Sequence, residues 1–351
     1  MFECILYDLL LICQYMKAKE VLIRILKDRE SEGILQSELY SLSYSKSTIA
    51  NALERLSKER EIIRRKIGKK QYRIWLTDYA PFPIEGVIRV GILRAVEYPH
   101  VLLTVERLKS EGIDARVRIF DSAMDATRAL AICQVDLACS PLVTQVINAL
   151  VFKSIRIYAG CGFNGSGIVF KSRDAERYAC SELSTMEANL KYYLKEERKL
   201  DLGEVDIMYF KSPERLVEAF TSCEVDAIAI WEPYLTTLKD FKVLEFKEIL
   251  GRFPCCTLAV NKDFEEEQHG LLEKFLKTYE RCSKKVYEER DLAIKLMGKY
   301  LGFDESLLRI SFGKFEYSSK ITIDEISETL KRFGLVLTKS AIEEIFHERI
   351  I

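Results

Sequence analysis

An internal repeat is the feature that most constrains the fold of this chain. The stretch 212–234 has an earlier partner, residues 122–140, and an offset of 90 between them places Asp136 over Asp226. The same offset pairs Ser122 with Ser212, Ala129 with Ala219, Cys133 with Cys223, and Val135 with Val225. Each copy has the spacing of an amphipathic helix, then a tight stop, then a short apolar strand with an aspartate near its start. Five identities in register indicate a duplicated unit, so we expect two similar α/β lobes.

Four segments then resemble a known family: ALAICQVDLACSPL (129–142), IRIYAG (155–160), VDAIAIWEPY (225–234) and LAVNKDF (258–264). Over about residues 87–337 the chain resembles the type II periplasmic binding proteins, and among them the sulfonate, nitrate and thiamine-pyrimidine binding proteins. The resemblance implies a small molecule bound between two lobes. Family members usually have glycine where this chain has Cys133 and Cys223, so the turn there is expected to be built differently.

The segment before these lobes has the element order of a helix-turn-helix followed by a hairpin. Apolar spacing predicts helices over 17–28, 36–42 and 46–60, and alternation predicts strands over 61–67 and 71–77 around Gly68-Lys69. This order resembles the winged-helix DNA-binding domain. Tyr72 and Trp75 are expected in its core rather than stacked on bases.

Charge is concentrated on the same segment. The whole chain has a net charge of −1, whereas residues 55–73 hold nine Lys or Arg against two Glu. On the winged-helix resemblance, the 46–60 helix would present its first turns to base edges and the hairpin would lie along phosphates. The expected DNA-binding residues are Lys46, Ser47, Thr48, Asn51, Arg55, Arg64, Arg65, Lys66, Lys69 and Lys70. The alternatives are a protein-contact module or a merely solvated charged face.

These patterns predict an α/β protein in which a two-lobed type II periplasmic-binding-protein-like domain follows a small α+β winged-helix domain. The expected domains are 1–78, with an extra N-terminal helix, a linker at 79–86 that contains Pro81 and Pro83, and 87–351. Within the last, one lobe would comprise about 87–172 and 258–351, and the other about 173–257. Regulators of the LysR type join similar domains through a long dimerising helix, which this sequence does not show.

Residues 1–16 (MFECILYDLLLICQYM) are apolar but carry no basic leader and are shorter than a membrane span. They are expected to form a buried or dimerising helix; alternatively, Met16 is the true start. Ten cysteines without a secretion signal indicate a reducing interior. A cytoplasmic protein without membrane contact is therefore expected.

Ligand-binding residues are expected where strands end, since open α/β sheets bind ligands there. Two of the loops leave more than one reading open. Residues 160–167 (GCGFNGSG) could form a hinge between lobes or an anion cradle. Ser184 and Glu187 fit a capping box whose helix start could also bind an anion. The expected ligand-binding residues are Arg94, Glu97, Tyr98, Ser140, Phe163, Asn164, Ser166, Ser184, Thr185, Trp231, Glu232 and Tyr234.

No catalytic constellation is found. His100 lies at a predicted helix start and is expected to be a polar surface residue. No C-x-x-C pair occurs and the three histidines are scattered, so no metal site is expected. Cys255 and Cys256 are adjacent in a predicted strand and are expected on its opposite faces. The resemblance also reaches a pyrimidine synthase with a cysteine-rich iron motif, which is not matched here.

Together these features predict a ligand-sensing transcriptional regulator, without cofactors, that binds double-stranded DNA and a small anionic or aromatic effector, as a homodimer. The alternative is a solute-binding protein of the ABC type whose N-terminal domain contacts protein; an enzyme of the pyrimidine-precursor type is the third reading. The ligand, the operator and the sign of regulation cannot be read from the sequence.

Overall fold

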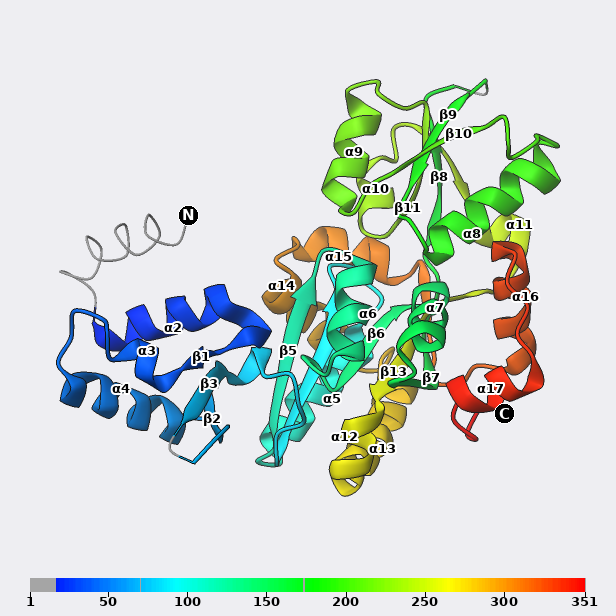
Figure 1. Cartoon of the computed structure of the whole chain (residues 1–351). Coiled ribbons are helices and arrows are strands. Elements are labelled where there is room, and N and C mark those ends of the chain that lie inside the picture. The colour runs from blue at the N-terminus through cyan, green and yellow to red at the C-terminus, as the bar shows by residue number, and fades with distance from the viewer. Residues whose placement is uncertain (1–16, 70, 173, 351) are drawn as a thin grey trace. The chain divides into compact units, whose positions relative to one another are not determined.

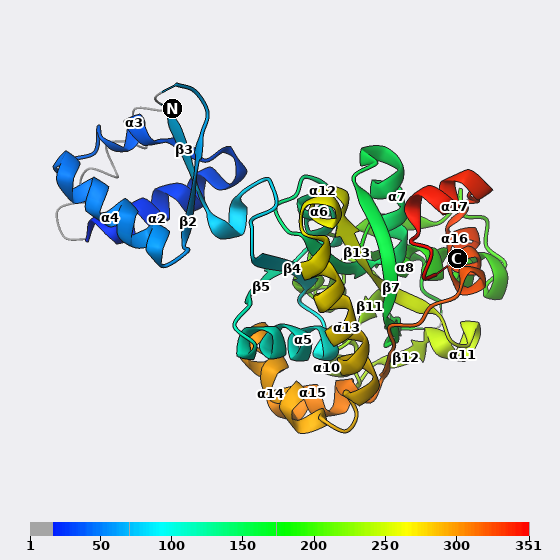
Figure 2. The same ribbon diagram turned by 90° about the horizontal axis from the view of Figure 1, so that it is seen from below.

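The computed structural model describes residues 17–69, 71–172 and 174–350, and the chain divides into two compact units, Met1–Ile84 and Glu85–Ile351 (Figures 1 and 2). The N-terminal helix expected over 1–16, the choice between Met1 and Met16, and the contact expected of Lys70 lie outside the described residues. Each unit is described by itself.

The first unit combines helices with a small antiparallel sheet of order β1-β3-β2. Its elements are α2 (Ala18–Arg29), η1 (Glu30–Glu32), β1 (Ile34–Leu35), α3 (Gln36–Leu39), α4 (Lys46–Lys58), β2 (Ile62–Lys66), β3 (Tyr72–Leu76) and η2 (Thr77–Tyr79). Ser45 caps α4 because its hydroxyl accepts a hydrogen bond from the amide of Thr48 (3.1 Å). Ile49, Leu53 and Leu56 recur at helical spacing and are buried in the core with Leu22.

Trp75 belongs to the core of the first unit, as expected. Its side chain is 6% exposed, and Nε1 donates to the carbonyl of Ser31 (2.9 Å). Tyr72, in contrast, is 39% exposed, so the core position expected for it is wrong. It lies at the outer end of the hairpin, where Arg64 stacks on its ring.

Two sheets form the second unit. The first lobe has a six-stranded sheet of order β14-β7-β13-β6-β4-β5, in which β4, β5 and β6 are parallel. Its strands are β4 (Val87–Leu93), β5 (Asp114–Phe120), β6 (Leu137–Pro141), β7 (Ile155–Asn164), β13 (Pro254–Asn261) and β14 (Phe315–Tyr317). Its helices are α5 (Pro99–Ser110), α6 (Ala123–Ala131) and α7 (Leu142–Phe152).

The second lobe has a five-stranded sheet of order β10-β9-β11-β8-β12. Its strands are β8 (Ser166–Phe170), β9 (Arg177–Cys180), β10 (Asp206–Tyr209), β11 (Ala227–Trp231) and β12 (Lys242–Glu245). Its helices are α8 (Thr185–Tyr192), which continues as a π-helical turn η3 (Tyr193–Glu197), α9 (Pro213–Thr221), α10 (Tyr234–Thr237) and α11 (Phe246–Leu250). In Figure 1 this second lobe lies above the first lobe.

The remaining helices follow β13: α12 (Lys262–Glu267), α13 (His269–Lys285), α14 (Arg290–Leu301), α15 (Glu305–Phe312), α16 (Ile323–Phe333) and α17 (Lys339–Ile345). They cover the first lobe, and α16 also packs on α8 of the second (Figure 1). Of these elements, α15 and the strand β14 after it are absent from the sequence prediction.

The chain crosses between the lobes twice, and the two crossings are bonded to each other. The first is at Gly165, between β7 and β8, and the second lies between Glu245 and Pro254. The amide of Asn164 donates to the carbonyl of Phe253 (3.1 Å), and the amide of Phe253 donates to Oδ1 of Asn164 (3.3 Å). The two crossing segments together form a hinge between the lobes.

The glycine-rich segment 160–167 is this crossing and not an anion cradle. A Cβ at Gly165, whose φ is +68°, would lie 2.2 Å from the ring of Phe315. A Cβ at Gly167 would lie 2.5 Å from the carbonyl of Leu244. The glycines are thus required by close packing of neighbouring strands, so of the two readings the hinge is the one supported.

Each lobe holds the same ion pair, between the aspartate of its repeat and an arginine on an earlier strand. In the first lobe, Arg89 of β4 donates from Nη2 and Nε to the carboxylate of Asp136 (2.7 and 3.0 Å), and its own amide donates to the same group (2.7 Å). In the second, Arg177 of β9 makes the corresponding bonds to Asp226 (2.8, 3.2 and 3.0 Å). Both pairs join the two parallel strands at the middle of each lobe. The duplicated aspartate is therefore a structural residue.

The cysteines that replace glycine in the repeat keep the left-handed turn. Cys133 has φ of +56° and Cys223 has φ of +66°, and both carbonyls accept from the arginine of their lobe (3.0 and 3.2 Å). The expectation that the turn would be built differently is thus wrong. The arginine bond supports a conformation that side chains other than glycine seldom adopt.

The two ion pairs differ in burial, which gives a matched test. The side chains of Arg89 and Asp136 are 2% and 0% exposed, whereas those of Arg177 and Asp226 are 46% and 25% exposed. We expect Arg89→Leu to lower the free energy of unfolding by about 3–5 kcal/mol, because it leaves a buried carboxylate unpaired. Arg177→Leu should cost about 1 kcal/mol. Urea unfolding of both variants measures the difference, and equal losses would contradict the account.

His100 is buried in the first lobe, so the surface position expected for it is wrong. Its side chain is 0% exposed. Nε2 lies 3.0 Å from the hydroxyl of Tyr279, which itself donates to the carbonyl of Gly160 (2.6 Å). The Tyr279 proton is thus used, so Nε2 donates to the Tyr279 oxygen. Burial lowers the pKa of His100 to about 3.

This burial predicts a loss of stability below neutral pH. Because the pKa of His100 is lower in the folded chain than in the unfolded chain, its contribution is complete above pH 6.5 and declines as the pH falls toward about 3. From pH 7 to pH 5 we expect the free energy of unfolding to fall by about 2 kcal/mol more in the native chain than in His100→Phe. Urea unfolding of the two chains at several pH values measures this difference. The same dependence of the free energy of unfolding on pH in both chains would contradict the prediction.

The neighbouring cysteines Cys255 and Cys256 do not point to opposite faces of their strand. The pairing of β13 with β7 is irregular between Pro254 and Thr257, so that Cys256 pairs with Gly162 while Thr257 pairs with Gly160. At such a bulge the alternation of side chains fails. The Sγ atoms of both cysteines consequently reach the carboxylate of Glu97.

Candidate functional site

A cleft lies between the two lobes, at the carboxyl ends of their strands. The first lobe contributes Leu93, Glu97, Ala123, Pro141 and Cys255. The second contributes Ser181, Ser184, Met186, Lys211 and Trp231. This is where open α/β sheets place their ligands. The space among these side chains, including the open mouth, is about 360 Å³.

The lobes are closed on this cleft. Its enclosed part measures about 20 Å³, which is room for about one water molecule. Hydrogen bonds join the lobes beside it, among them those from the amide of Val96 to the carbonyl of Glu232 (3.3 Å), from Thr144 Oγ1 to the carbonyl of Leu183 (2.7 Å), and from Thr185 Oγ1 to the carbonyl of Cys255 (3.0 Å). A ligand larger than a few atoms therefore requires the lobes to separate.

Hydrogen-bond donors dominate the second-lobe wall of the cleft. Nε1 of Trp231 is buried and has no hydrogen-bond partner among the described residues. Ser184 caps α8 by accepting from the amide of Glu187 (3.3 Å), and Ser184 and Met186 both line the cleft, so the start of this helix lies at it. Lys211 is exposed at the cleft and forms no ion pair with the part of the chain that the structure describes. An unpaired indole N–H, a helix start and an ammonium together suit a negatively charged ligand.

The carboxyl groups near the cleft add little negative charge that would repel such a ligand. Burial raises the pKa of Glu97, which favours its neutral form. Burial likewise raises the pKa of Glu232. Glu187 accepts from Lys191 Nζ (2.6 Å) and from the amide of Leu183 (2.6 Å), so its charge is compensated.

Of the twelve residues expected to bind ligand, three line the cleft: Glu97, Ser184 and Trp231. The loop after β4 supplies the first, the capped start of α8 the second, and the end of β11 the third. Ser184 shows that capping and a position at the cleft coexist, as the capping-box argument allowed.

The other nine residues do not line the cleft, and most of them are committed to structural contacts. Arg94 is paired with Asp121 (3.2 Å) and also donates to the carbonyl of Leu301 (2.9 Å). Ser140 is bonded to Thr127 (2.8 Å). Tyr98 is fully buried, and Ser166 is 2% exposed with a hydroxyl that lacks a partner among the described residues.

The remaining five support the hinge and the lobe contacts. Phe163 lies under the guanidinium of Arg252 (3.6 Å), and Asn164 forms the hinge bonds. Thr185 bonds Cys255 across the lobes. The carboxylate of Glu232 accepts from Thr236 and Ser311, and the Tyr234 hydroxyl donates to Glu214 (2.7 Å). A strand end thus places a residue near the cleft without directing its side chain into it.

Sequence reasoning missed Ser181, Met186, Lys211 and Cys255. For Lys211 a signal was present, because it directly precedes Ser212, where the second copy of the repeat begins at a strand end. For Cys255 no signal was present, since the bulge that turns it inward depends on pairing with β7.

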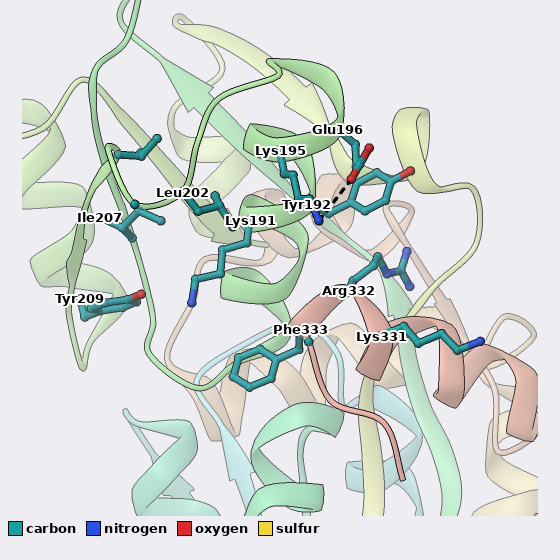
Figure 3. A pocket seen from close by; sticks show the side chains of 13 residues that line it. Lys191, Tyr192, Lys195, Glu196, Leu202, Ile207, Tyr209, Lys331, Arg332 and Phe333 are labelled. Atoms are coloured by element: carbon teal, nitrogen blue, oxygen red, sulfur yellow. Dashed lines mark ion pairs between the residues drawn. The ribbon is translucent and has the colours of Figure 1, made fainter.

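A second, larger cavity lies on the second unit between α8, η3, β10 and α16, with a volume of about 750 Å³. Figure 3 shows Lys191 and Lys195 on one side of this groove and Lys331 and Arg332 on the other. Lys191 is neutralised by Glu187, and Lys195 is paired with Glu196 (3.9 Å). The groove is basic but open, and the cleft between the lobes is the better enclosed site.

The residues expected to contact DNA lie on the surface of the first unit. The five on α4 and the four described ones of the hairpin are all exposed. Several already have partners: Arg55 pairs with Glu59 (2.9 Å), Arg64 donates to Oε1 of Gln36 (2.6 Å), and Arg65 stacks on Phe82 (3.6 Å). The hydroxyls of Ser47 and Thr48 are hydrogen-bonded to that of Ser45 (2.8 and 2.7 Å). Exposure is necessary for DNA binding but does not demonstrate it.

No protein-family model and no curated protein sequence matches this chain. Solved structures do. A ligand-binding component of an ABC-type import system from Staphylococcus aureus, with zinc bound, is 17% identical with a TM-score of 0.66, covering 75% of this chain and 97% of the other. The alkanesulfonate-binding protein of Xanthomonas axonopodis, bound to MOPS, is 18% identical with a TM-score of 0.60, covering 72% and 92%. The periplasmic nitrate-binding protein of Synechocystis is 11% identical with a TM-score of 0.64, covering 76% and 87%.

The second unit therefore has the two-lobed periplasmic-binding-protein fold. The similar structures are described as binding proteins of small solutes, which accords with a small-molecule ligand. They give no support to transcription regulation, to DNA binding or to a dimer. At these identities the likeness establishes the fold alone.

The cytoplasmic location expected from the sequence is overturned by these findings. The nitrate-binding protein, and an aliphatic sulphonate-binding protein from Escherichia coli that is 15% identical with a TM-score of 0.59, are both described as periplasmic. They point to the periplasm instead. Within the described residues, no helix has the length and apolarity needed to span a bilayer.

Proposed function

We propose that the second unit binds a small anionic solute in the cleft between its lobes, as a solute-binding protein of the ABC type, and that the first unit contacts a protein partner. The observation that carries the proposal is the buried, unpaired Nε1 of Trp231 at the cleft. A buried donor without an acceptor costs about 1–3 kcal/mol, and a ligand oxygen would remove that cost.

Selectivity for anions follows from the other groups at the same wall. Lys211 and the start of α8 supply positive potential, and burial, which raises the pKa of Glu97, reduces repulsion from that group. A sulfonate, nitrate, carboxylate or phosphate group fits this pattern. Binding would stabilise the closed arrangement because the donors on the second lobe and the wall of the first lobe then contact one ligand.

The cleft assignment predicts two selective losses of affinity. Trp231→Phe keeps an aromatic ring but removes the N–H donor together with part of the indole, and Lys211→Met removes the charge at nearly constant side-chain length. Each should weaken binding of the preferred anion about 10- to 100-fold, as expected for one hydrogen bond to a charged group. Calorimetric titration of the full chain with sulfonate, nitrate, carboxylate and phosphate compounds measures this.

Lys295→Met is the matched control, since Lys295 is exposed on α14 and does not line the cleft. It should bind as the native chain does. If all three variants bind the anion equally well, the ligand lies elsewhere and the proposal fails.

A second candidate function rests on the geometry of the first unit. We propose that it can contact double-stranded DNA, because α3, a short turn and α4 precede a hairpin whose exposed side chains are basic. Residues 17–84 would then form the winged-helix domain, and the solute would alter DNA affinity through lobe closure. The periplasmic location of the similar structures favours a protein partner instead. DNA binding by the first unit therefore distinguishes the two candidates.

The DNA candidate predicts a salt-sensitive interaction carried by the hairpin. Lys66 and Lys69 are better targets than Arg64 and Arg65, whose side chains have the internal contacts described above. In K66A/K69A, affinity for duplex DNA should fall on all sequences alike, and the slope of log affinity against log salt should decrease by about 0.9 per lost phosphate contact. K27A, which removes an exposed charge on α2, should have little effect. Absence of DNA binding at low salt would leave the protein-contact role.

A further inference from the structure

Three metal-ligating side chains meet at the first-lobe wall of the cleft. Glu97, Cys255 and Cys256 each offer a ligand atom, and these atoms all lie within 4.8 Å of one another. All three residues are buried. Glu97 comes from the loop after β4, and the cysteines come from β13, so the cluster joins segments more than 150 residues apart.

The side chains of the cluster contact one another closely, but one carboxylate oxygen of Glu97 lacks a hydrogen-bond partner among the described residues. Cys256 Sγ lies 2.8 Å from Oε2 of Glu97 and 3.5 Å from the hydroxyl of Tyr98. The other carboxylate oxygen, Oε1 of Glu97, is buried and has no hydrogen-bond partner among the described residues. Burial raises the pKa of Glu97, and the side chains hydrogen-bonded to its carboxyl group, those of the two cysteines and Tyr98, are not cationic. The carboxyl group thus has no positively charged partner among the residues that the structure describes.

This donor set selects a class of metal ion. Two sulfurs and one carboxylate oxygen suit zinc and other thiophilic divalent cations, whereas calcium and magnesium require oxygen ligands. Zinc bonds of about 2.0–2.3 Å in a tetrahedron place ligand atoms about 3.3–3.8 Å apart. The three ligand atoms lie within 4.8 Å of one another, with Cys256 Sγ 2.8 Å from Oε2 of Glu97, so side-chain movements of about 1 Å are needed to reach this spacing.

We propose that Glu97, Cys255 and Cys256 form a binding site for a thiophilic divalent cation such as Zn²⁺, with a coordination position open to the cleft. Glu97 and Cys255 both line the cleft, whose enclosed volume can hold a water molecule or one ligand atom beside them. The cation would bind through its thiolate and carboxylate ligands and would attract an anion to the same cleft. This proposal departs from the expectation of no metal site, which rested on the absence of a C-x-x-C pair; a site assembled by a bulge does not require that spacing.

This inference deepens the proposed function, since the site forms one wall of the solute cleft, but the two are separable. The metal ligands belong to the first lobe, and the anion donors Trp231 and Lys211 belong to the second. Substitution of the metal ligands need not abolish anion binding, and substitution of the anion donors need not abolish metal binding.

The test uses cadmium, because its thiolate complexes absorb in the ultraviolet. The full chain carrying C4S, C13S and C223S, which removes two cysteines of residues 1–16 and the exposed Cys223, is reduced with a non-thiol reductant and titrated with Cd²⁺. We expect one equivalent to bind with thiolate-to-metal absorption, and Zn²⁺ to displace it. Adding C255S or C256S should weaken binding at least about tenfold, and E97Q should weaken it without removing the absorption.

Cys282→Ser is the matched control, because Cys282 is a buried free cysteine on α13 outside the cluster. It should leave the titration unchanged. Should a cluster variant fail to fold, X-ray absorption of the zinc-loaded background chain decides instead, with two sulfur ligands and oxygen expected. No stoichiometric cadmium absorption, or absorption equally strong in C255S and C256S, would overturn the site.

The anion titrations keep the two proposals apart. If Cd²⁺ binds as expected while no anion binds to the native chain, the metal site stands and the proposed function fails. If anions bind and Trp231→Phe weakens them while Cd²⁺ does not bind, the proposed function stands and the metal site fails.

Discussion

The fold of the second unit depends on one interaction used twice, the ion pair between an arginine on one central strand and an aspartate at the start of its parallel neighbour. In each lobe the arginine also bonds the carbonyl of the left-handed cysteine that ends the preceding helix. The pair thereby fixes strand register, helix end and strand start at once. In the first lobe it is fully buried, and the carbonyl of Asp136 further accepts from the amide of Asn261 on β13. Asp136 thus also aligns β13, the strand with which the chain returns to the first lobe.

The cleft follows from that alignment. Because β4, β6, β9 and β11 end at the facing edges of the two sheets, their last residues and following loops meet between the lobes. The hinge at Asn164, Gly165 and Phe253 permits only two short connections, so closure brings the same side chains together each time. The second lobe presents donors and the first presents a carboxyl and a thiol. This asymmetry is what makes the cleft suited to an anion on one wall and to a cation on the other.

The sequence predicted the architecture better than the site. Periodicity located most helices within a few residues, and the repeat revealed two lobes because Asp136 and Asp226 perform the same task. Their partners Arg89 and Arg177 lie 47 and 49 residues earlier, outside the aligned copies, and were not found. His100 was misplaced because a helix start in sequence gives no measure of what covers it. Likewise, alternation predicts opposite faces for Cys255 and Cys256, and only pairing with β7 shows the bulge.

A crystal structure of the full chain grown with its preferred anion would test the central claim most directly. The account predicts anion density between the lobes, within hydrogen-bond distance of Trp231 Nε1 and the first amides of α8, with Lys211 turned toward it. Density in the basic groove of Lys331 and Arg332 instead, with the cleft unchanged, would contradict it.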